Sequence, residues 1–259
     1  MSSLDKNTRE KFKALKICVV IPTYNNAKFL ESVLNSVLAE VDDIIVVNDG
    51  SPDNTDEILS SYNQKITVIK HKSNQGKGIA LKSGFKKAVE LGFEYAVTMD
   101  SDSQHKATDL YKFADMIENN PGCLVVGSRN LDGKELSQGS GFANKFSNFW
   151  FTVHTFHRLS DTQTGYRIYP LNQVANMHIF SSKYETELEM LVRCAWKGVD
   201  IHSVPIEVYY PPKGERVSGF RPARDFTRIS ILNTIFTIVA FFYGYPSMLV
   251  HYLIKKITG

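Results

Sequence analysis

The chain has 259 residues, a length that suits one α/β domain with a short appendage. Hydrophobic residues make up 43% and charged residues 22%, which supplies a full core and excludes wholesale disorder. The formal net charge of +3 is too small to indicate a nucleic-acid partner. The three cysteines lie far apart without metal-ligand spacing, a pattern typical of a reduced, cytosolic protein.

The first 16 residues are polar and lack the apolar core of a signal peptide, so we expect an N-terminal extension that is not a leader. Short, β-branched apolar runs then alternate with helical patterns. Buried strands are predicted at 17–22, 43–47, 65–70, 94–100 and 124–127. Helices are predicted at 27–39, after a cap at Ser51 or Asp53, and from residue 77 to about 91. This alternation favours an α/β fold, a mostly parallel sheet flanked by helices.

The regular alternation ends after Arg129. We predict helices at 144–158 and 184–197, a strand at 200–210, and a loop rich in proline and arginine at 211–224. In the first of these helices an apolar row is expected to face the core, with a groove for a lipid chain as the alternative. Its members are Phe146, Phe149, Trp150, Val153 and Phe156.

The most specific feature is Asp100-Ser101-Asp102, which follows the strand predicted at 94–100. In open α/β sheets, ligands bind at the carboxyl ends of the strands. Two carboxylates this close repel each other unless a cation lies between them, and Mg²⁺ or Mn²⁺ would suit their oxygens and those of Gln104. A solvated acidic turn explains an isolated Asp-x-Asp, but the strand context and the neighbouring motifs favour the metal.

Two further polar turns are predicted at the same sheet edge. Tyr24 follows the first strand and could lie against a base, and Asp49 follows the second and could accept from a base or ribose donor. Lys77, between two glycines at a helix start, either meets a phosphate or is a surface lysine. The sequence contains neither the glycine pattern of dinucleotide oxidoreductases after the first strand nor a Walker sequence. These turns together predict a nucleotide pocket.

The ordered series PTYN, VNDGSPDNT, NQGKG, DSDSQH, GSR and DTQTGYR resembles the family 2 glycosyltransferases over about residues 17–228. Within that family it is most similar to the dolichyl- and polyprenyl-phosphate mannose and glucose synthases. The resemblance implies a GT-A-type fold, a nucleotide-sugar donor such as GDP-mannose or a UDP-sugar, a divalent metal, and inversion at the anomeric carbon.

The resemblance also implies roles for particular positions. The nucleotide-sugar site would be lined by Pro22, Tyr24, Asp49, Lys77, Asp100, Ser101, Asp102 and Arg129. The metal would be held by Asp102 and Gln104, and the acceptor side would be bordered by the segment from Asp161 to Arg167. Catalysis would involve Asp102, Glu187 and two arginines of a basic loop, Arg216 and Arg221, which would stabilise the leaving diphosphate.

The sequence departs from the family pattern at several positions. Asn26 stands where the synthases usually carry Glu, Asn48 where Asp is usual, and Lys106-Ala107 where prolines are expected. Arg221 occupies what is often a lysine. These departures leave the base of the donor and the acceptor open, but not the type of reaction.

The acceptor decides whether a base is needed. A polyprenyl phosphate is already ionised near neutrality, whereas a hydroxyl of a lipid or surface glycan requires proton removal, for which Glu187 is the candidate. The alternative for Glu187 is an exposed carboxylate in the first turn of a helix. Two other readings are weaker. A nucleotidyltransferase would carry a glycine- and lysine-rich loop after strand one, and a membrane-bound sugar-nucleotide sensor would not need the intact acidic motif.

Residues 229–254 contain no charged side chain and are bracketed by Arg221, Arg224 and Arg228 on one side and by Lys255 and Lys256 on the other. We expect residues 229–259 to be a hydrophobic membrane-associated segment following a glycosyltransferase domain at 17–228. Gly244-Tyr245-Pro246 should interrupt the helix, so a bent in-plane or re-entrant segment at the cytoplasmic face of a membrane is predicted. The alternative is a buried helix or a dimer interface, and the oligomeric state is left open.

Overall fold

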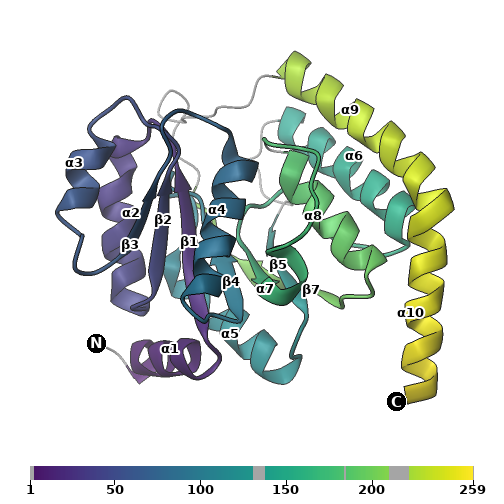
Figure 1. The fold of residues 1–259 in the computed structure, drawn as a ribbon, viewed down its shortest axis with the longest axis horizontal. Coiled ribbons are helices and arrows are strands. Elements are labelled where there is room, and N and C mark those ends of the chain that lie inside the picture. The colour runs from purple at the N-terminus through teal and green to yellow at the C-terminus, as the bar shows by residue number, and fades with distance from the viewer. Residues whose placement is uncertain (1–2, 131–137, 184, 210–221, 259) are drawn as a thin grey trace.

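The computed structural model describes residues 3–130, 138–183, 185–209 and 222–258, and in this part of the chain seven strands form one sheet in the order β3-β2-β1-β4-β6-β5-β7 (Figure 1). The strands are β1 (Ile17–Thr23), β2 (Ile44–Asn48), β3 (Thr67–Lys70), β4 (Tyr95–Thr98), β5 (Leu124–Arg129), β6 (Arg167–Pro170) and β7 (Ile201–Ile206). Only β6 is antiparallel to its neighbours, β4 and β5. The predicted mostly parallel α/β sheet is confirmed.

Helices cover both faces of the sheet. They are α1 (Ser3–Ala14), α2 (Ala27–Glu40), α3 (Thr55–Ser60), α4 (Lys77–Glu90), α5 (Leu110–Asn119), α6 (Gln138–Thr155), α7 (Leu171–Val174), α8 (Glu185–Trp196), α9 (Pro222–Val239) and α10 (Tyr245–Thr258). One apolar core lies between the sheet and α1, α2 and α5, and the other lies under α4 and α6 to α9. Every residue of β1 is buried, as its continuous apolar run predicts for a central parallel strand.

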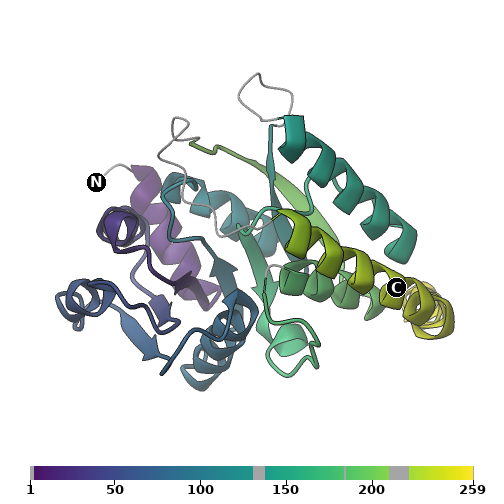
Figure 2. The ribbon, with the colours of Figure 1, turned by 90° about the horizontal axis from the view of Figure 1, so that it is seen from above.

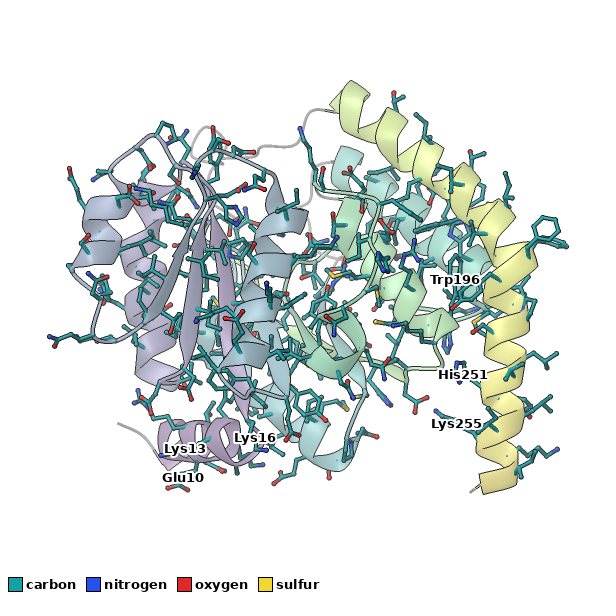
Figure 3. All side chains as sticks on the ribbon, in the orientation of Figure 1. Glu10, Lys13, Lys16, Trp196, His251 and Lys255 are labelled. Atoms are coloured by element: carbon teal, nitrogen blue, oxygen red, sulfur yellow. The ribbon has the colours of Figure 1, made fainter. Side chains whose placement is uncertain are left out.

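The N-terminal residues pack on the domain instead of extending from it. Phe12 of α1 is buried in the core beneath the sheet, because it packs with residues of α2 and α5. Lys11 Nζ lies 2.7 Å from Asp115 Oδ1 and 2.6 Å from Glu118 Oε2, both on α5. Figure 3 shows the polar side chains of Glu10, Lys13 and Lys16 at the lower edge of the molecule. A polar helix with one buried aromatic residue therefore replaces the predicted extension.

The C-terminal segment is one bent helix. A π turn, residues 240–244, joins α9 to α10, and the N–H of Tyr245 donates to the carbonyl of Ala240. The change of direction between α9 and α10 is visible in Figure 1. The predicted bend at Gly244-Tyr245-Pro246 is present (Figure 1), but the chain does not leave the helical state there. The π turn lets it remain helical and places Pro246 in the first turn of α10, where proline is tolerated.

Gly244 allows close packing at this bend. A Cβ atom there would lie 2.5 Å from the indole of Trp196 on α8. Within the described residues, Ile229–Ile257 is the one helix whose length and apolar composition would suffice to cross a membrane. This statement rests on length and composition alone. Of the 18-residue apolar window in this helix, 28% is buried inside the protein.

The apolar row predicted to face the core on α6 is wrong. Phe149 is 60% exposed and Phe156 is 70% exposed, whereas Phe151 and His154 are fully buried. The buried side of α6 also carries Ser147, whose hydroxyl accepts a hydrogen bond from Thr162. Polar side chains that find partners inside the protein lie on the buried side, and pattern analysis assigns such residues to the solvent.

Candidate functional site

The carboxyl ends of β1, β2 and β4 meet at one edge of the sheet, as the strand pattern predicts. Parallel pairing sets Thr23 beside Asn48, so that Tyr24 and Asp49 follow at the same level. Tyr24 is 48% exposed at this edge, while Pro22 before it lies in β1, paired with Val47. This edge therefore brings together the residues predicted to line a nucleotide site.

Asp49 is the hub of the loop that leads into α4. Its Oδ1 lies 2.6 Å from Nδ1 of His71 and accepts from the N–H of Gln75 at 3.0 Å, and its Oδ2 accepts from the N–H of Gly76 at 2.8 Å. Because a carboxylate only accepts, His71 donates from Nδ1, and its Nε2 lies 2.9 Å from the hydroxyl of Ser83. Asp49 thus fixes this loop.

Lys77 is not a surface lysine, because its ammonium has partners inside the protein. Its Nζ lies 2.6 Å from Asp100 Oδ1 and 3.0 Å from Glu187 Oε2. Burial works against the charges, but Asp100 and then Glu187 raise the pKa of Lys77 above its usual value. Burial likewise opposes ionisation of Asp100, yet Lys77 lowers the pKa of that carboxyl. The three groups form a partly buried cluster, the Lys77 cluster, in which two carboxylates share one ammonium.

Two glycines make room for the Lys77 cluster. A Cβ at Gly165, just before β6, would lie 2.6 Å from Asp100 Oδ2 and 2.8 Å from Lys77 Nζ. A Cβ at Gly78 would lie 2.0 Å from Thr186 Oγ1, so this glycine permits the close approach of α4 and α8. The two glycines therefore set the distance between Lys77 and the carboxylates of Asp100 and Glu187.

Glu187 is buried in the first turn of α8, so the alternative of an exposed carboxylate is wrong. Its Oε2 meets Lys77, but its Oε1 is buried and has no hydrogen-bond partner within the described part of the chain. A buried carboxylate oxygen without a donor is costly. A hydroxyl of a bound substrate is the kind of donor that would satisfy it.

Asp102 has the features of a carboxylate that holds a cation. Burial, and next the charge of Asp100, raise the pKa of Asp102 to about 6, so a positive ion beside it would relieve an unfavourable charge. Asp102 Oδ1 accepts from the backbone N–H of Gln104 at 3.1 Å, so this carboxylate is fixed to the turn that carries the second predicted ligand. Among the described residues no group of three or more His, Cys, Asp or Glu side chains is placed to hold a metal ion. The oxygens of Asp102 and Gln104 are of the kind that Mg²⁺ or Mn²⁺ binds when substrate phosphates supply the other ligands.

The turn of the acidic motif is fixed by Asn26, one of the residues that depart from the family pattern. Nδ2 of Asn26 donates to the carbonyl of Ser101 at 2.5 Å and to its hydroxyl at 3.1 Å. The usual Glu at this position could not donate to a carbonyl. Asn48 also has a partner that suits an amide, because its Nδ2 donates to Asp56 Oδ1 at 2.7 Å.

The residues predicted for the donor and acceptor sides bind each other. Arg129 at the end of β5 forms a bidentate pair with Asp161, with Nε 2.6 Å from Oδ2 and Nη2 2.9 Å from Oδ1. Arg167 is fully buried and donates to carbonyls of Thr162, Thr164 and Glu187. It therefore supports the segment before β6 and the start of α8 from within, and we expect no direct contact with an acceptor.

Two of the predicted site residues are not described by the structure, and two residues at the site were not predicted. Arg216 and Arg221 lie outside the described residues. His71 and Ser83 are absent from the predicted set, although His71 directly follows β3 at the same sheet edge as Tyr24, Asp49 and Asp100. The position of His71 after a predicted strand was a signal that could have identified it.

Comparison with known proteins agrees with this geometry. The family model for glycosyl transferase family 2 matches residues 18–170. The chain is 33% identical to the UDP-N-acetylglucosamine–dolichyl-phosphate N-acetylglucosaminyltransferase of Methanococcus voltae, covering 75% of this chain and 86% of that protein. It is 27% identical to the undecaprenyl-phosphate mannosyltransferase of Micrococcus luteus, covering 79% and 88%.

Among solved structures, glucosyl-3-phosphoglycerate synthase from Mycobacterium tuberculosis, in complex with Mn²⁺, UDP and phosphoglyceric acid, has a TM-score of 0.67 at 18% identity. The match covers 91% of this chain and 82% of that one, so the predicted GT-A-type fold is confirmed. The family match, the relatives and the acidic motif at the sheet edge lead to one conclusion: the chain is a glycosyltransferase that belongs to glycosyl transferase family 2.

Proposed function

We propose that this protein transfers a sugar from a nucleotide diphosphate donor to a polyprenyl phosphate, with inversion at the anomeric carbon, at the cytoplasmic face of a membrane. The observation that carries the proposal is the arrangement of acidic groups at the carboxyl edge of the sheet. There Asp102 is free of a cationic partner within the described residues, while Asp100 beside it is neutralised by Lys77. One carboxylate is thus left for a cation and a donor diphosphate.

The donor would lie across this edge. Tyr24 offers an exposed ring for a base, and the loop held by Asp49 forms the floor beside it. The sugar would then reach the Lys77 cluster, where the unpartnered Oε1 of Glu187 would accept from one of its hydroxyls. Because the relative of Methanococcus voltae is named for UDP-N-acetylglucosamine, that donor is the first to test, followed by GDP-mannose.

A divalent ion, Mg²⁺ or Mn²⁺, would be held by Asp102 with Gln104 beside it, and when bound it would supply positive charge to the leaving diphosphate. The chain's own contribution is orientation. Asn26 holds the turn at Ser101, and Lys77 holds Asp100 away from that diphosphate. Arg216 and Arg221 are proposed to add guanidinium groups to the phosphates.

A phosphate acceptor explains the chemistry with the fewest groups, because it is ionised near neutrality and attacks without a base. The relatives named for dolichyl and undecaprenyl phosphate support this class of acceptor. The second candidate is a hydroxyl of a lipid or surface glycan, which the unpartnered oxygen of Glu187 favours because a general base must reach the proton it removes.

The test is transfer by the purified protein from labelled UDP-N-acetylglucosamine or GDP-mannose, with Mn²⁺ or Mg²⁺, to either a polyprenyl phosphate or the matching polyprenol. We expect product only from the phosphate and only with the metal. Product from the alcohol alone would support the second candidate, and undiminished transfer in EDTA would contradict the metal assignment.

A further inference from the structure

The outer side of the bent C-terminal helix carries a continuous row of exposed apolar side chains. Its exposure runs from 44% at Ile235 to 83% at Phe242. We define the apolar ridge by six of its members, Ile231, Ile235, Ile238, Phe241, Phe242 and Leu253. From Ile231 to Phe241 the members are three or four residues apart, which places them along one side of the helix as far as the π turn. Phe242 lies in that turn and Leu253 lies on α10. Large apolar patches of this kind on a single protein mark an interaction site.

The opposite side of the same helix is fixed to the catalytic domain before the bend. Leu232 and Phe236 of α9 are buried against α6 and α8, and Phe236 packs edge-on against the ring of Trp196 at 5.5 Å. Nε2 of His154 on α6 lies 3.2 Å from the carbonyl of Asn233. Figure 2 shows α9 running beside α6 and α8 along one flank of the molecule.

The helix is also fixed after the bend. The hydroxyl of Ser247 donates to the carbonyl of Trp196 at 2.7 Å, and Lys255 Nζ lies 2.7 Å from Asp200. Figure 3 shows His251 and Lys255 on the side of α10 that faces the domain. A Cβ at Gly198 would lie 2.7 Å from His251, so α10 approaches the turn after α8 closely.

These contacts exclude a bilayer on that side of the helix. From residue 232 to residue 255 a helix extends about 35 Å at 1.5 Å per residue, more than the roughly 30 Å of a hydrocarbon core. Since the domain touches the helix along this length, the helix could span the bilayer only by taking polar parts of the domain into it. Its apolar and buried sides instead suit a helix lying along a surface.

Other groups around the ridge match the polar boundary of a bilayer. Phe156 at the end of α6 is exposed and packs against Tyr245 at 4.8 Å, which extends the ridge across the bend. Tyr252, next to Leu253 in the sequence, is 64% exposed, and tyrosine is enriched at the boundary between lipid and water. Arg158, just after Phe156, and Lys256 in the last turn of α10 are exposed cations that suit anionic headgroups.

We propose that the apolar ridge is a monotopic lipid-binding surface: the bent helix lies in the plane of one leaflet with the ridge in the acyl boundary, and it does not cross. The active-site edge is then held next to the same leaflet, because α9 begins at the side of the molecule where β1, β2 and β4 end (Figure 1). The choice of polyprenyl phosphate as substrate rests on the proposed function, but the attachment does not.

The first test is flotation of the purified protein with sealed phosphatidylcholine vesicles, with and without phosphatidylglycerol. We expect binding that anionic lipid strengthens, and at least about a tenfold weaker partitioning for the double variant Phe241→Ser and Phe242→Ser. The matched control is Val89→Ser with Leu91→Ser, which removes two exposed apolar side chains at the end of α4 and should bind normally. Unchanged thermal unfolding would show that the double serine variant retains the fold.

Two results would overturn the lipid surface. One is equal binding of the double variant and the parent. The other is a parent protein that is dimeric without lipid and becomes monomeric on Phe241→Ser and Phe242→Ser, since the ridge would then be an interface between two copies.

The second test decides between lying in and crossing the membrane. Single cysteines replace Lys256 on α10 and Glu57 on α3, both exposed, while the three native cysteines are buried. In sealed membrane vesicles an impermeant maleimide should label both positions from the same side. Labelling of Lys256→Cys only after detergent, with Glu57→Cys labelled before it, would show a crossing helix and overturn the proposal. Comparing inside-out with right-side-out vesicles tests the cytoplasmic location separately, because only one orientation exposes that face to the maleimide. Transfer assayed in detergent tests the proposed reaction separately.

Discussion

The ammonium of Lys77 lies 2.6 Å from the Asp100 carboxylate, so the first acidic residue of the DSD motif has its countercharge within the protein. Glu187 shares the same ammonium at 3.0 Å. The two carboxylates of the motif therefore differ in environment although they lie two residues apart. Asp100 is neutralised from within, and Asp102 is left for a ligand.

Removing the shared cation should destabilise the fold. In Lys77→Met, Asp100 and Glu187 face each other in a partly buried site without a countercharge. We expect a loss smaller than the about 3–5 kcal/mol that removing one partner of a fully buried pair costs. Urea unfolding measures this loss. The control Lys86→Met removes an exposed lysine of the same helix and should change stability by less than about 0.5 kcal/mol. Equal unfolding curves for the two variants would show that the cluster does not exist in solution.

The loop held by Asp49 should depend on His71. In His71→Phe the carboxylate keeps its two backbone donors but loses the ring N–H, and the Ser83 hydroxyl loses its partner on the ring. We expect the unfolding free energy to fall by about 1–3 kcal/mol. Nucleotide affinity, measured by calorimetry, should fall further in His71→Phe than in Ser83→Ala, because His71 contacts Asp49 directly and Ser83 contacts only the His71 ring. Unaltered nucleotide affinity in His71→Phe would separate this loop from the nucleotide site.

The size of the effect at Glu187 should identify the acceptor class. Glu187→Gln keeps a side-chain oxygen for Lys77 but cannot remove a proton. For a phosphate acceptor we expect single-turnover transfer to change little, and for a hydroxyl acceptor to fall about 10²-fold or more. A nearly silent variant whose product is an ordinary glycoside would show that Glu187 is not the base.

The interface between α6 and α9 should weaken in acid because of His154. Burial lowers the pKa of His154 from the model-peptide value of 6.5 to about 4, so the unfolded chain binds a proton at a higher pH than the folded protein does. Its contribution is fully present above pH 6.5 and is lost as pH falls from 6.5 to 4, by at most about 3 kcal/mol. Urea unfolding across this range should show a smaller acid loss in His154→Gln, whereas His178→Gln, at an exposed site, should match the parent. Identical pH dependence in both would contradict a buried neutral ring.

The sequence predicted the half of the site that depends on strand ends. Apolar runs located β1, β2 and β4, and polar residues directly after them had to meet at one edge, which places Tyr24, Asp49 and Asp100 together. The partner of Lys77 could not be predicted in this way. Glu187 reaches it only because Gly78 lets α4 and α8 approach closely, and such packing has no local signal.

Elsewhere local patterns favoured the wrong structure. The apolar pattern assigned the wrong face of α6 to the core. The face that is buried carries Ser147 and His154, which have hydrogen-bond partners from other segments. At Gly244 and Pro246 the two residues that commonly end helices are accommodated by a π turn packed on Trp196. The pairing of Arg129 with Asp161 likewise joins segments that no spacing relates.

The most direct test of the central claim is the product itself, made from an α-linked nucleotide sugar and polyprenyl phosphate and analysed by phosphorus and proton NMR. We predict a β-linked glycosyl phosphodiester that forms only with Mg²⁺ or Mn²⁺. Asp102→Asn, which keeps the shape of the side chain, should make it on the order of 10³-fold more slowly while unfolding like the parent. An α-linked product, a glycoside without phosphorus, or full activity of Asp102→Asn would contradict the account.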